Sequence, residues 1–321
     1  MADKAELLVI CGPTATGKTA LSVALAQRLD GEIVCADSMQ IYRGLSVGTA
    51  KVTPAEMQGV SHHLVDFLPP ETRFSVAEYA ELAKKCIADI TARGKLPIVV
   101  GGTGLYLQSI VKGIDFSQQE TNFFLRNQLQ ERLSKEGVKP LWDELRAADP
   151  ACAAAIHPNN RVRVLRALEL YLQTGKTKAQ QLSESLPAER PYRDVLVGLD
   201  CAVREALYSR IDARVEEMLA RGLLAEARLV FDNRAQYVTA AQAIGYKELF
   251  PYFEGTAPLA SCVAALKQAS RNYAKRQLTW FRHMEGMHWF LSGAEDTEDA
   301  VVKLFIETCG ERKAHGKTLS Y

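Results

Sequence analysis

The chain lacks several features that would place it in a specialised class of protein. Its seven cysteines form no CxxC pair, so the sequence indicates neither a zinc site nor a disulfide framework. No apolar run approaches the length of a membrane-spanning helix, and no fixed-period repeat or low-complexity tract occurs. The net charge is only +1, which argues against a protein that coats nucleic acid through bulk charge. A local basic groove is still compatible with this composition.

The scattered cysteines and the start of the chain favour the cell interior. Isolated cysteines in a chain of 321 residues are typical of reduced, buried thiols in the cytosol. The first predicted strand begins within a few residues of Met1, so we expect no signal peptide. We therefore expect a cytoplasmic protein that has no membrane partner. Our working expectation for its oligomeric state is a monomer.

Short apolar runs alternate with amphipathic segments along the chain. The runs predict buried strands at residues 7–11, 33–36, 64–68, 98–100, 195–199 and 288–291. Helical spacing follows the first run over residues 18–29, and a capping box of Ser75 and Glu78 predicts a helix that ends at Gly94. Alternating strands and helices predict an α/β fold with a parallel sheet covered on both faces.

Residues 12–19, GPTATGKT, match the phosphate-binding pattern GxxxxGK[ST] at every position. They follow a predicted strand and open a predicted helix, which is the context that the motif requires. Glycines let the backbone wrap an anion closely, and the N–H groups at the start of the helix point toward it. Lys18 adds a positive charge, and the Thr19 hydroxyl is available to Mg²⁺. A second GKT, at residues 175–177, follows a helix and is better explained by Gly175 as a helix end.

The long stretch between the fourth and fifth predicted strands has few strand signals and many charged residues. It predicts a helical insertion where P-loop kinases carry a lid, followed by a helix over residues 161–172 that returns to the sheet. We therefore expect a P-loop NTPase-like parallel sheet core with a helical insertion and a helical C-terminal region. The expected divisions are the first part of the core (1–116), the insertion (117–157), the completion of the core with a helical region (158–295), and a C-terminal helix and tail (296–321).

The chain has no carboxylate where ATP-hydrolysing P-loop enzymes usually hold Mg²⁺, because the fourth predicted strand ends in GGTG at residues 101–104. The acidic residue lies instead after the second predicted strand, at Asp37. Ligands bind beyond the carboxyl ends of the strands in an open α/β sheet, so Asp37, Thr103 and the P-loop should converge on one crevice. The chemistry of Asp37 leaves three roles open, those of metal ligand, general base and helix cap, and favours a functional role over the cap.

Six blocks, taken in chain order, resemble one family. They are GPTATGKT (12–19), DSMQIYRGLSVGTAK (37–51), VGGTGLY (100–106), HPNNRVRVLRALE (157–169), AIGYKE (243–248) and AKRQLTWFR (274–282). In this order they resemble the bacterial tRNA dimethylallyltransferases, also called tRNA isopentenyltransferases. The resemblance implies transfer of a dimethylallyl group from dimethylallyl diphosphate to N6 of adenosine 37 in the anticodon stem-loop of tRNA. Diphosphate is then the leaving group and Mg²⁺ the cofactor.

The resemblance also implies roles for individual residues. Asp37 is the expected general base, with Thr19 as metal ligand and Arg214 as a further catalytic group. The expected diphosphate-binding residues are Gly12, Pro13, Thr14, Ala15, Thr16, Gly17, Lys18 and Thr19. The expected tRNA-binding residues are Asp37, Ser38, Met39, Gln40, Thr103, Arg126, Asn159, Asn160, Arg161, Val162, Arg163, Gln242, Ala243, Ile244, Gly245 and Tyr246.

The implied chemistry suits a phosphate-binding loop. An allylic diphosphate ionises to a resonance-stabilised cation, whereas the adenine amine is a poor nucleophile. The main task is therefore to stabilise the departing diphosphate, which the P-loop, Mg²⁺ and an arginine do by preorganised electrostatics. Asp37 then has to orient the amine and take its proton late.

Basic residues near the C-terminus fall on one face of a predicted helix. Lys267, Arg271, Lys275 and Arg282 are spaced by four, four and seven positions. The spacing alone favours a solvated helix face over an RNA-binding stripe, whereas the family resemblance favours tRNA binding by Arg271, Lys275 and Arg282. Trp280 and Phe281 are expected to pack inward on a different face. We interpret Phe123–Phe124 as part of the insertion core, and His62–His63 as a polar strand edge, not a metal site.

Other functions share part of this pattern. A prenyltransferase that acts on free adenine nucleotides shares most of it, but would not need the basic helical region. A small-molecule P-loop kinase shares the phosphate loop, but would need an acidic metal ligand. A P-loop switch or RNA-binding module would need loops that sense a γ-phosphate, and the sequence carries no such signature. The tRNA prenyltransferase is therefore the leading hypothesis.

Overall fold

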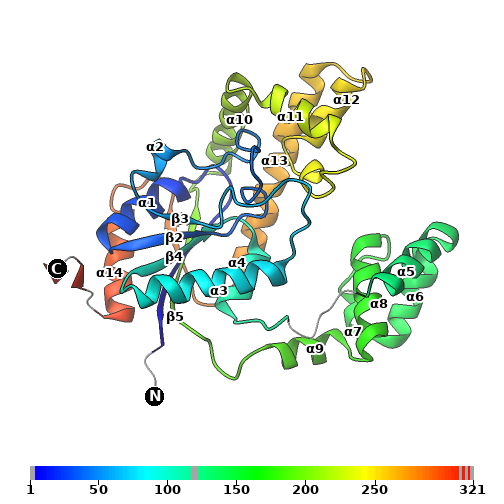
Figure 1. Ribbon diagram of the computed structural model, residues 1–321, viewed down its shortest axis with the longest axis horizontal. Helices are drawn as coiled ribbons and strands as arrows, with labels where there is room; N and C mark the ends of the chain where they lie inside the picture. Colours follow the sequence, from blue (N-terminus) through cyan, green and yellow to red (C-terminus); the bar gives the residue numbers. More distant parts are fainter. Residues whose placement is uncertain (1–3, 117–121, 311–312, 315–316, 319–321) are drawn as a thin grey trace. The chain divides into compact units, whose positions relative to one another are not determined.

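The computed structural model describes residues 4–116, 122–310, 313–314 and 317–318 of the chain (Figure 1). The chain divides into two compact units. The first comprises Met1–Val111 and Pro191–Tyr321, and the second is Lys112–Arg190. The second unit is wider than the expected insertion at 117–157.

The first unit is built on a six-stranded sheet in which every pairing is parallel. The strand order is β3 (His62–His63), β2 (Gly31–Cys35), β4 (Leu96–Gly101), β1 (Glu6–Cys11), β5 (Arg193–Asp200) and β6 (Met287–Leu291). The central strands β1 and β4 are almost entirely buried, as the apolar runs within them predict. This confirms the predicted α/β fold with a parallel core.

One strand prediction was wrong. Residues 64–68 do not form a strand, because Leu64 and Asp66 have φ angles of +57° and +54°, outside the extended region. The strand lies just before them, at β3, and only an isolated bridge between Tyr42 and Leu68 remains. Since β3 is the edge strand of the sheet, the interpretation of His62–His63 as a strand edge is confirmed.

Helices cover both faces of the sheet. On one face, α1 (Lys18–Arg28) and α14 (Thr297–Cys309) share a hydrophobic cluster with alternate residues of β1, β2, β4 and β5. On the other, α3 (Val76–Ala92) packs with α4 (Gly104–Val111) and against β2 and β4 (Figure 1). The predicted capping box begins α3, with Ser75 and Glu78 each bonded to the other's backbone. A short helix, α2 (Pro54–Met57), lies between β2 and β3.

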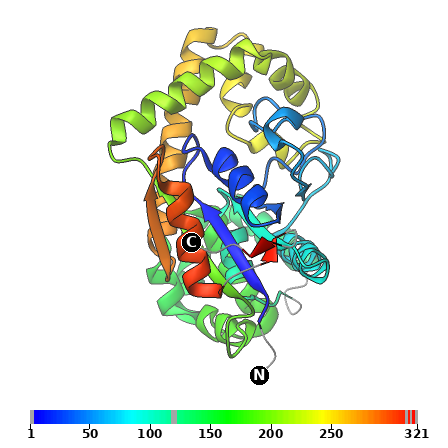
Figure 2. The same ribbon diagram turned by 90° about the vertical axis from the view of Figure 1, so that its left-hand side faces the viewer.

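A helical region completes the first unit. It consists of α10 (Arg204–Ala220), α11 (Leu223–Asp232), η1 (Ala240–Gln242), η2 (Lys247–Leu249), α12 (Phe250–Phe253) and α13 (Leu259–Arg282). The loop after β2 packs on this region, because Ile41, Tyr42 and Leu45 share a hydrophobic cluster with α10, α11, α13 and both 3-10 helices. Figure 2 shows this light-blue loop against the yellow segment of the helical region. Beyond α14, β7 (Lys313–Ala314) and β8 (Lys317–Thr318) form a short antiparallel pair.

All regular secondary structure in the described part of the second unit is helical. Its helices are α5 (Phe123–Glu136), α6 (Val138–Ala148), α7 (Pro150–Ala154), α8 (Arg161–Thr174) and α9 (Lys178–Ser185). The expectation that α8 returns to the sheet was wrong, because Val164 and Leu168 join Leu129 and Leu145 in the core of this unit. Gly175 ends α8 with a left-handed φ of +67°, as predicted for the second GKT.

The aromatic pair at the start of α5 was misplaced by the sequence interpretation. Phe123 and Phe124 are 66% and 72% exposed, so they do not belong to the core of the second unit. Leu125, Leu129 and Leu133 of the same helix pack inward instead. No helix in the described ranges combines the length and the apolar character needed to cross a bilayer.

Candidate active site

The P-loop turns sharply between β1 and α1. Gly12 has a φ of +150°, and a Cβ placed on it would lie 2.6 Å from the carbonyl oxygen of Leu199. Gly17 has a φ of +80° at the start of α1, a conformation in which a side chain is strained. The Thr16 hydroxyl donates to the carbonyl oxygen of Pro13 at 2.8 Å, which closes the turn. The backbone conformation therefore favours glycine at both positions, and the close approach of Leu199 requires it at Gly12.

The side chain of Lys18 folds back onto the P-loop. Its ammonium group donates to the carbonyl oxygen of Pro13 at 2.7 Å. Burial lowers the pKa of Lys18 to about 8, the nearby Arg214 acts in the same direction, and Asp37 opposes both. Two cations and one carboxylate therefore lie close enough to influence one another. A bound anion would relieve the mutual repulsion of the cations.

Asp37 follows β2 at the carboxyl end of the sheet. Its Oδ1 accepts hydrogen bonds from the backbone N–H groups of Met39 at 2.8 Å and Gln40 at 3.3 Å. Asp37 therefore caps a turn and not a helix, because the next helix, α2, begins only at Pro54. This capping occupies one oxygen of the carboxylate, so it does not exclude a catalytic role for the other.

Thr103 joins the loop after β2 to the loop after β4. Its hydroxyl oxygen accepts from the backbone N–H of Ser38 at 3.0 Å, and its own N–H donates to the carbonyl oxygen of Ala36 at 3.1 Å. The predicted convergence of Asp37, Thr103 and the P-loop at one end of the sheet is consistent with these contacts.

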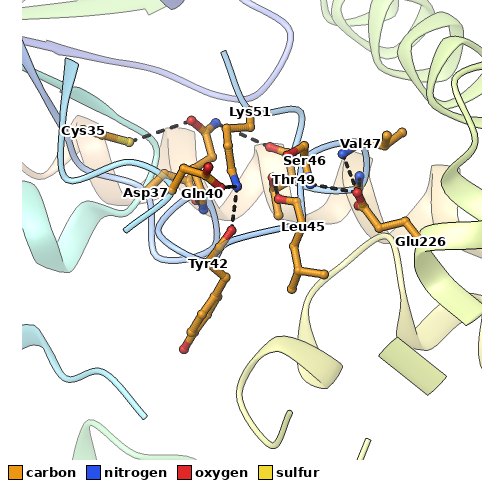
Figure 3. Close-up of polar contacts among 12 residues, drawn as sticks. Cys35, Asp37, Gln40, Tyr42, Leu45, Ser46, Val47, Thr49, Lys51 and Glu226 are labelled. Atoms are coloured by element: carbon orange, nitrogen blue, oxygen red, sulfur yellow. Dashed lines mark hydrogen bonds and ion pairs between the residues drawn. The ribbon is translucent and has the colours of Figure 1, made fainter. Parts of the chain in front are cut away.

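The loop that continues from Asp37 returns to contact two predicted site residues. Gln40 donates through Nε2 to the carbonyl oxygens of Thr49 and Ala50, each at 3.4 Å (Figure 3). Arg214, from α10, also donates to the Ala50 carbonyl oxygen at 3.4 Å. The buried ammonium group of Lys51 pairs with Asp66 and holds the end of the loop. Residues 37–51 therefore form one connected substructure.

Sequence reasoning missed Gln277. This side chain of α13 is buried, its Oε1 accepts from the backbone N–H of Thr14 at 3.1 Å, and its Nε2 donates to the carbonyl oxygen of Gly102 at 3.0 Å. The residue lies within the AKRQLTWFR block, but spacing alone did not reveal its partners. Gln277 ties the P-loop to the loop after β4.

Sequence reasoning also missed Glu226 and Arg210. Glu226, on α11, accepts hydrogen bonds from the backbone N–H groups of Ser46, Val47 and Gly48. Arg210 donates to the Ser292 hydroxyl at 2.8 Å, which in turn donates to the carbonyl oxygen of Thr16 in the P-loop at 2.9 Å. No motif indicated either residue, since their partners are distant in sequence.

Only part of the expected tRNA-binding segment at residues 242–246 has accessible side chains. Tyr246 has no exposed surface and Ala243 is 5% exposed, so neither side chain offers RNA a contact. The Tyr246 hydroxyl instead donates to Glu226 at 2.7 Å. Gly245 packs its backbone against Gly48. Gln242 is exposed and Ile244 partly exposed, so these two side chains are accessible.

The basic residues of α13 do not form a free stripe. Lys267 pairs with Glu216 at 2.5 Å and Arg271 with Asp212 at 2.7 Å, both partners on α10, while Arg282 pairs with Asp200 at 3.0 Å. The ammonium group of Lys275 lies 5.7 Å from the centre of the Tyr208 ring. The predicted helix is confirmed, but most of its positive charge is neutralised within the protein.

The two aromatic residues near the end of α13 differ in burial. Phe281 is completely buried, as predicted. Trp280 is 40% exposed, so the expectation that it packs inward was wrong. Its ring lies against Gly104, where a Cβ atom would overlap it.

The remaining predicted tRNA-binding residues lie in the second unit. Arg126 forms two hydrogen bonds with Glu169, at 3.1 and 3.2 Å, and Glu169 also binds Arg166. Asn160 caps α8 by accepting from the backbone N–H of Arg163 at 3.2 Å. Asn159, Arg161, Val162 and Arg163 are exposed. The start of α8 therefore presents two accessible guanidinium groups, whereas Arg126 and Asn160 have structural partners.

The carboxylates of the described residues do not gather into a metal site. Within the described ranges, no group of three or more His, Cys, Asp or Glu residues could hold an ion. Thr19 is exposed in the first turn of α1, directly after the P-loop lysine. Mg²⁺ usually keeps several waters and binds through few protein groups together with substrate phosphates. A hydroxyl beside a phosphate-binding loop fits that mode of binding.

Comparison with known proteins places these features in context. Residues 40–284 match the family described as IPP transferase. The chain is 46% identical over 309 residues to a tRNA dimethylallyltransferase of Bacillus subtilis, covering 96% of this chain and 98% of the relative. It resembles the solved full-length tRNA isopentenylpyrophosphate transferase of Bacillus halodurans, with 42% identity, a TM-score of 0.71 and 96% of each chain covered. A eukaryotic dimethylallyltransferase acting on tRNA gives 30% identity and a TM-score of 0.80, covering 94% of this chain and 78% of that one.

Proposed function

The chain belongs to the IPP transferase family and transfers a dimethylallyl group to tRNA, and we propose that the donor is dimethylallyl diphosphate and the acceptor N6 of adenosine 37. The observation that carries this proposal is that Lys18 lies on the P-loop while Arg214 contacts the loop that continues from Asp37, so the three charges influence one another. Two cations beside a P-loop suit a diphosphate, and a carboxylate beside them suits an amine that must lose a proton.

The P-loop residues, Gly12 to Thr19, bind the diphosphate in this proposal. The backbone N–H groups at the start of α1 and the charges of Lys18 and Arg214 face the leaving group. These groups favour bond breaking because their dipoles and charges are fixed before the reaction begins. Thr19 is the residue that would hold Mg²⁺, which supplies additional positive charge next to the phosphates when bound.

Asp37 acts on the acceptor. Its Oδ1 is engaged by the backbone of Met39 and Gln40, so we assign Oδ2 to the adenine amine. The carboxylate orients the amine and takes its proton after attack on the allylic carbon has begun. The target base must leave its stack to reach this site.

The surface available to tRNA differs from the set of residues expected from sequence. In the first unit we retain Ser38, Met39, Gln40, Thr103, Gln242, Ile244 and Lys275, whose side chains are at least partly exposed. In the second unit we retain Asn159, Arg161, Val162 and Arg163 at the start of α8. Arg126, Asn160, Ala243, Tyr246, Arg271 and Arg282 are bonded or buried within the protein, and we assign them to positioning.

One assay tests the donor and the acceptor together. The protein is incubated with Mg²⁺ and dimethylallyl diphosphate labelled in its carbon chain, and is offered unmodified tRNA, free AMP or neither. We expect label only in tRNA, and digestion of the product should yield N6-isopentenyladenosine. Label on AMP would move the function to a prenyltransferase of free nucleotides. No transfer in any of these mixtures, together with ATP turnover in a separate incubation, would favour a kinase instead.

The cellular setting and oligomeric state are part of the same proposal. The cysteines of the described residues are free, which supports a cytoplasmic enzyme. We propose that it acts as a monomer, which light scattering of the pure protein tests directly.

A further inference from the structure

Glu226 accepts four hydrogen bonds from groups outside its own helix. Its Oε2 accepts from the backbone N–H groups of Ser46 at 2.8 Å and Val47 at 2.9 Å (Figure 3). Its Oε1 accepts from the backbone N–H of Gly48 at 2.7 Å and from the hydroxyl of Tyr246 at 2.7 Å. An ionised carboxylate is an acceptor-only group with about four lone-pair sites, so it matches this set of four donors.

The three consecutive N–H groups form a small anion-binding nest, and Glu226 supplies the anion from within the protein. The Tyr246 hydroxyl is the fourth donor to this carboxylate. The pKa of Tyr246 is raised by burial and by the adjacent Glu226 carboxylate, so its hydroxyl remains a donor. Hydrogen bonds to a charged acceptor are stronger than neutral ones, which suits a clamp on an otherwise irregular loop.

The AIGYKE block fits the same loop sterically. The Tyr246 ring lies so close to Gly48 that a Cβ atom there would overlap it. Gly245 has a φ of +112°, and a Cβ on it would lie 3.1 Å from the carbonyl oxygen of Gly48. Both glycines are therefore required where the two backbones meet.

The clamped segment leads directly to two carbonyl groups that hold proposed substrate-binding side chains. The oxygens of Thr49 and Ala50 accept from Gln40, and the oxygen of Ala50 also accepts from Arg214. The proposed function assigns Gln40 to tRNA and Arg214 to the diphosphate. A shift of residues 46–48 would therefore move both contacts together.

We propose that Glu226, together with Tyr246, is a positioning residue that holds the loop at residues 46–50 and so sets Gln40 and Arg214 for tRNA and diphosphate. The proposal rests on the function given above. It assigns the Tyr246 end of the AIGYKE block to the alignment of the two substrates and not to contact with RNA.

The test compares two single variants with a matched control. Glu226→Gln keeps the size of the side chain but turns an N–H₂ group toward backbone donors. Tyr246→Phe removes only one hydroxyl. Asp232→Asn, an exposed carboxylate on the same helix paired with Arg228, is the control. Steady-state kinetics are measured for tRNA and for dimethylallyl diphosphate, with thermal melting alongside.

We expect Glu226→Gln to lower kcat/KM for tRNA by about 10- to 100-fold, since small displacements of aligned groups cost rates of this size. The KM for the diphosphate donor should rise as well, because Arg214 is displaced. Tyr246→Phe should change the same constants in the same direction by a smaller factor, and Asp232→Asn should match the wild type. A combined Glu226→Gln, Arg214→Lys variant should lose less than the product of the two single losses.

The proposal would be overturned if folded Glu226→Gln had the kcat/KM for tRNA and the donor KM of the wild type. It would also be overturned if the loss in the combined variant equalled the product of the two single losses. If Glu226→Gln does not fold, the proposal is tested by the kcat/KM for tRNA and the donor KM of Tyr246→Phe. Amide hydrogen exchange of residues 46–48 separates this proposal from the function itself. If the wild type transfers nothing to tRNA, the proposed function fails. The role of Glu226 is tested separately, because unchanged amide exchange of residues 46–48 in the variants would overturn it whatever the function is.

Discussion

The side-chain oxygen of Gln277 accepts a hydrogen bond from the backbone N–H of Thr14, at 3.1 Å. Through the same amide, Gln277 donates to the carbonyl oxygen of Gly102 at 3.0 Å. A residue of the helix expected to face RNA therefore fixes a turn of the phosphate loop. The contact couples the part of the protein that we assign to tRNA with the part that we assign to the donor.

Gln277→Leu should weaken donor binding. The substitution leaves the Thr14 N–H and the Gly102 carbonyl without their partner, and each lost partner in a buried site costs about 1–3 kcal/mol. We expect the KM for dimethylallyl diphosphate to rise about tenfold, which corresponds to roughly 1.4 kcal/mol. Gln268→Ala, an exposed glutamine on the same helix, is the control. An unchanged donor KM in Gln277→Leu would show that the contact is not needed to shape the loop.

Asp37→Asn separates the two roles of Asp37. The amide oxygen can still accept from the backbone of Met39 and Gln40, so the loop and the melting temperature should be preserved. Loss of the base should lower the single-turnover rate by about 10²–10⁴-fold. Donor affinity should stay the same or improve, because a negative charge near the diphosphate is removed. A normal single-turnover rate would rule out Asp37 as the base.

The basic residues of α13 should contribute unequally to tRNA binding. Lys275 is exposed and has no ion-pair partner among the described residues, whereas Lys267 is paired with Glu216. Lys275→Ala should therefore lower tRNA affinity and reduce the salt dependence of binding by about one phosphate contact. Lys267→Ala should leave that salt dependence close to the wild type. Equal effects of the two substitutions would contradict this ranking.

Acid should weaken the fold partly through Glu32. This carboxylate, 4% exposed on β2, is bonded to Arg93, His63 and Lys95. The Arg93 hydrogen bonds, with smaller contributions from His63 and Lys95, lower the pKa of Glu32 from 4.5 to about 2. Because the pKa of Glu32 is lower in the folded chain, the unfolded chain binds more protons than the folded chain between pH 2 and pH 4.5. The stabilisation is therefore complete above pH 4.5 and is lost as the pH falls toward 2.

Urea unfolding at several pH values checks this expectation. Glu32→Gln should lower the free energy of unfolding by on the order of 2 kcal/mol at pH 7, and the difference from the wild type should shrink below pH 4.5. Glu131→Gln, which removes one exposed carboxylate paired with Lys135, should have little effect at any pH. A difference that stays constant down to pH 3 would assign the effect to packing and not to the charge.

Local sequence patterns predicted most of the core correctly. The phosphate loop, the α3 capping box and the apolar strands depend on residues that are neighbours in sequence, so their spacing carries the information. The pattern failed at residues 64–68, where left-handed backbone conformations at Leu64 and Asp66 interrupt an apolar run. It failed again at Phe123 and Phe124, because periodicity does not say which face of an isolated helix finds a partner.

The sequence by itself determined the P-loop, the parallel order of strand and helix, and the blocks that identify the family. Tertiary structure alone decided how the site is held together. Thr14 and Gln277 are 263 positions apart, and Gly48 and Glu226 are 178 positions apart. Whether a glutamine, a glutamate or a lysine faces RNA or another part of the protein depends on such distant partners. A buried polar group must find a hydrogen-bond partner, and only the folded chain reveals which one it finds.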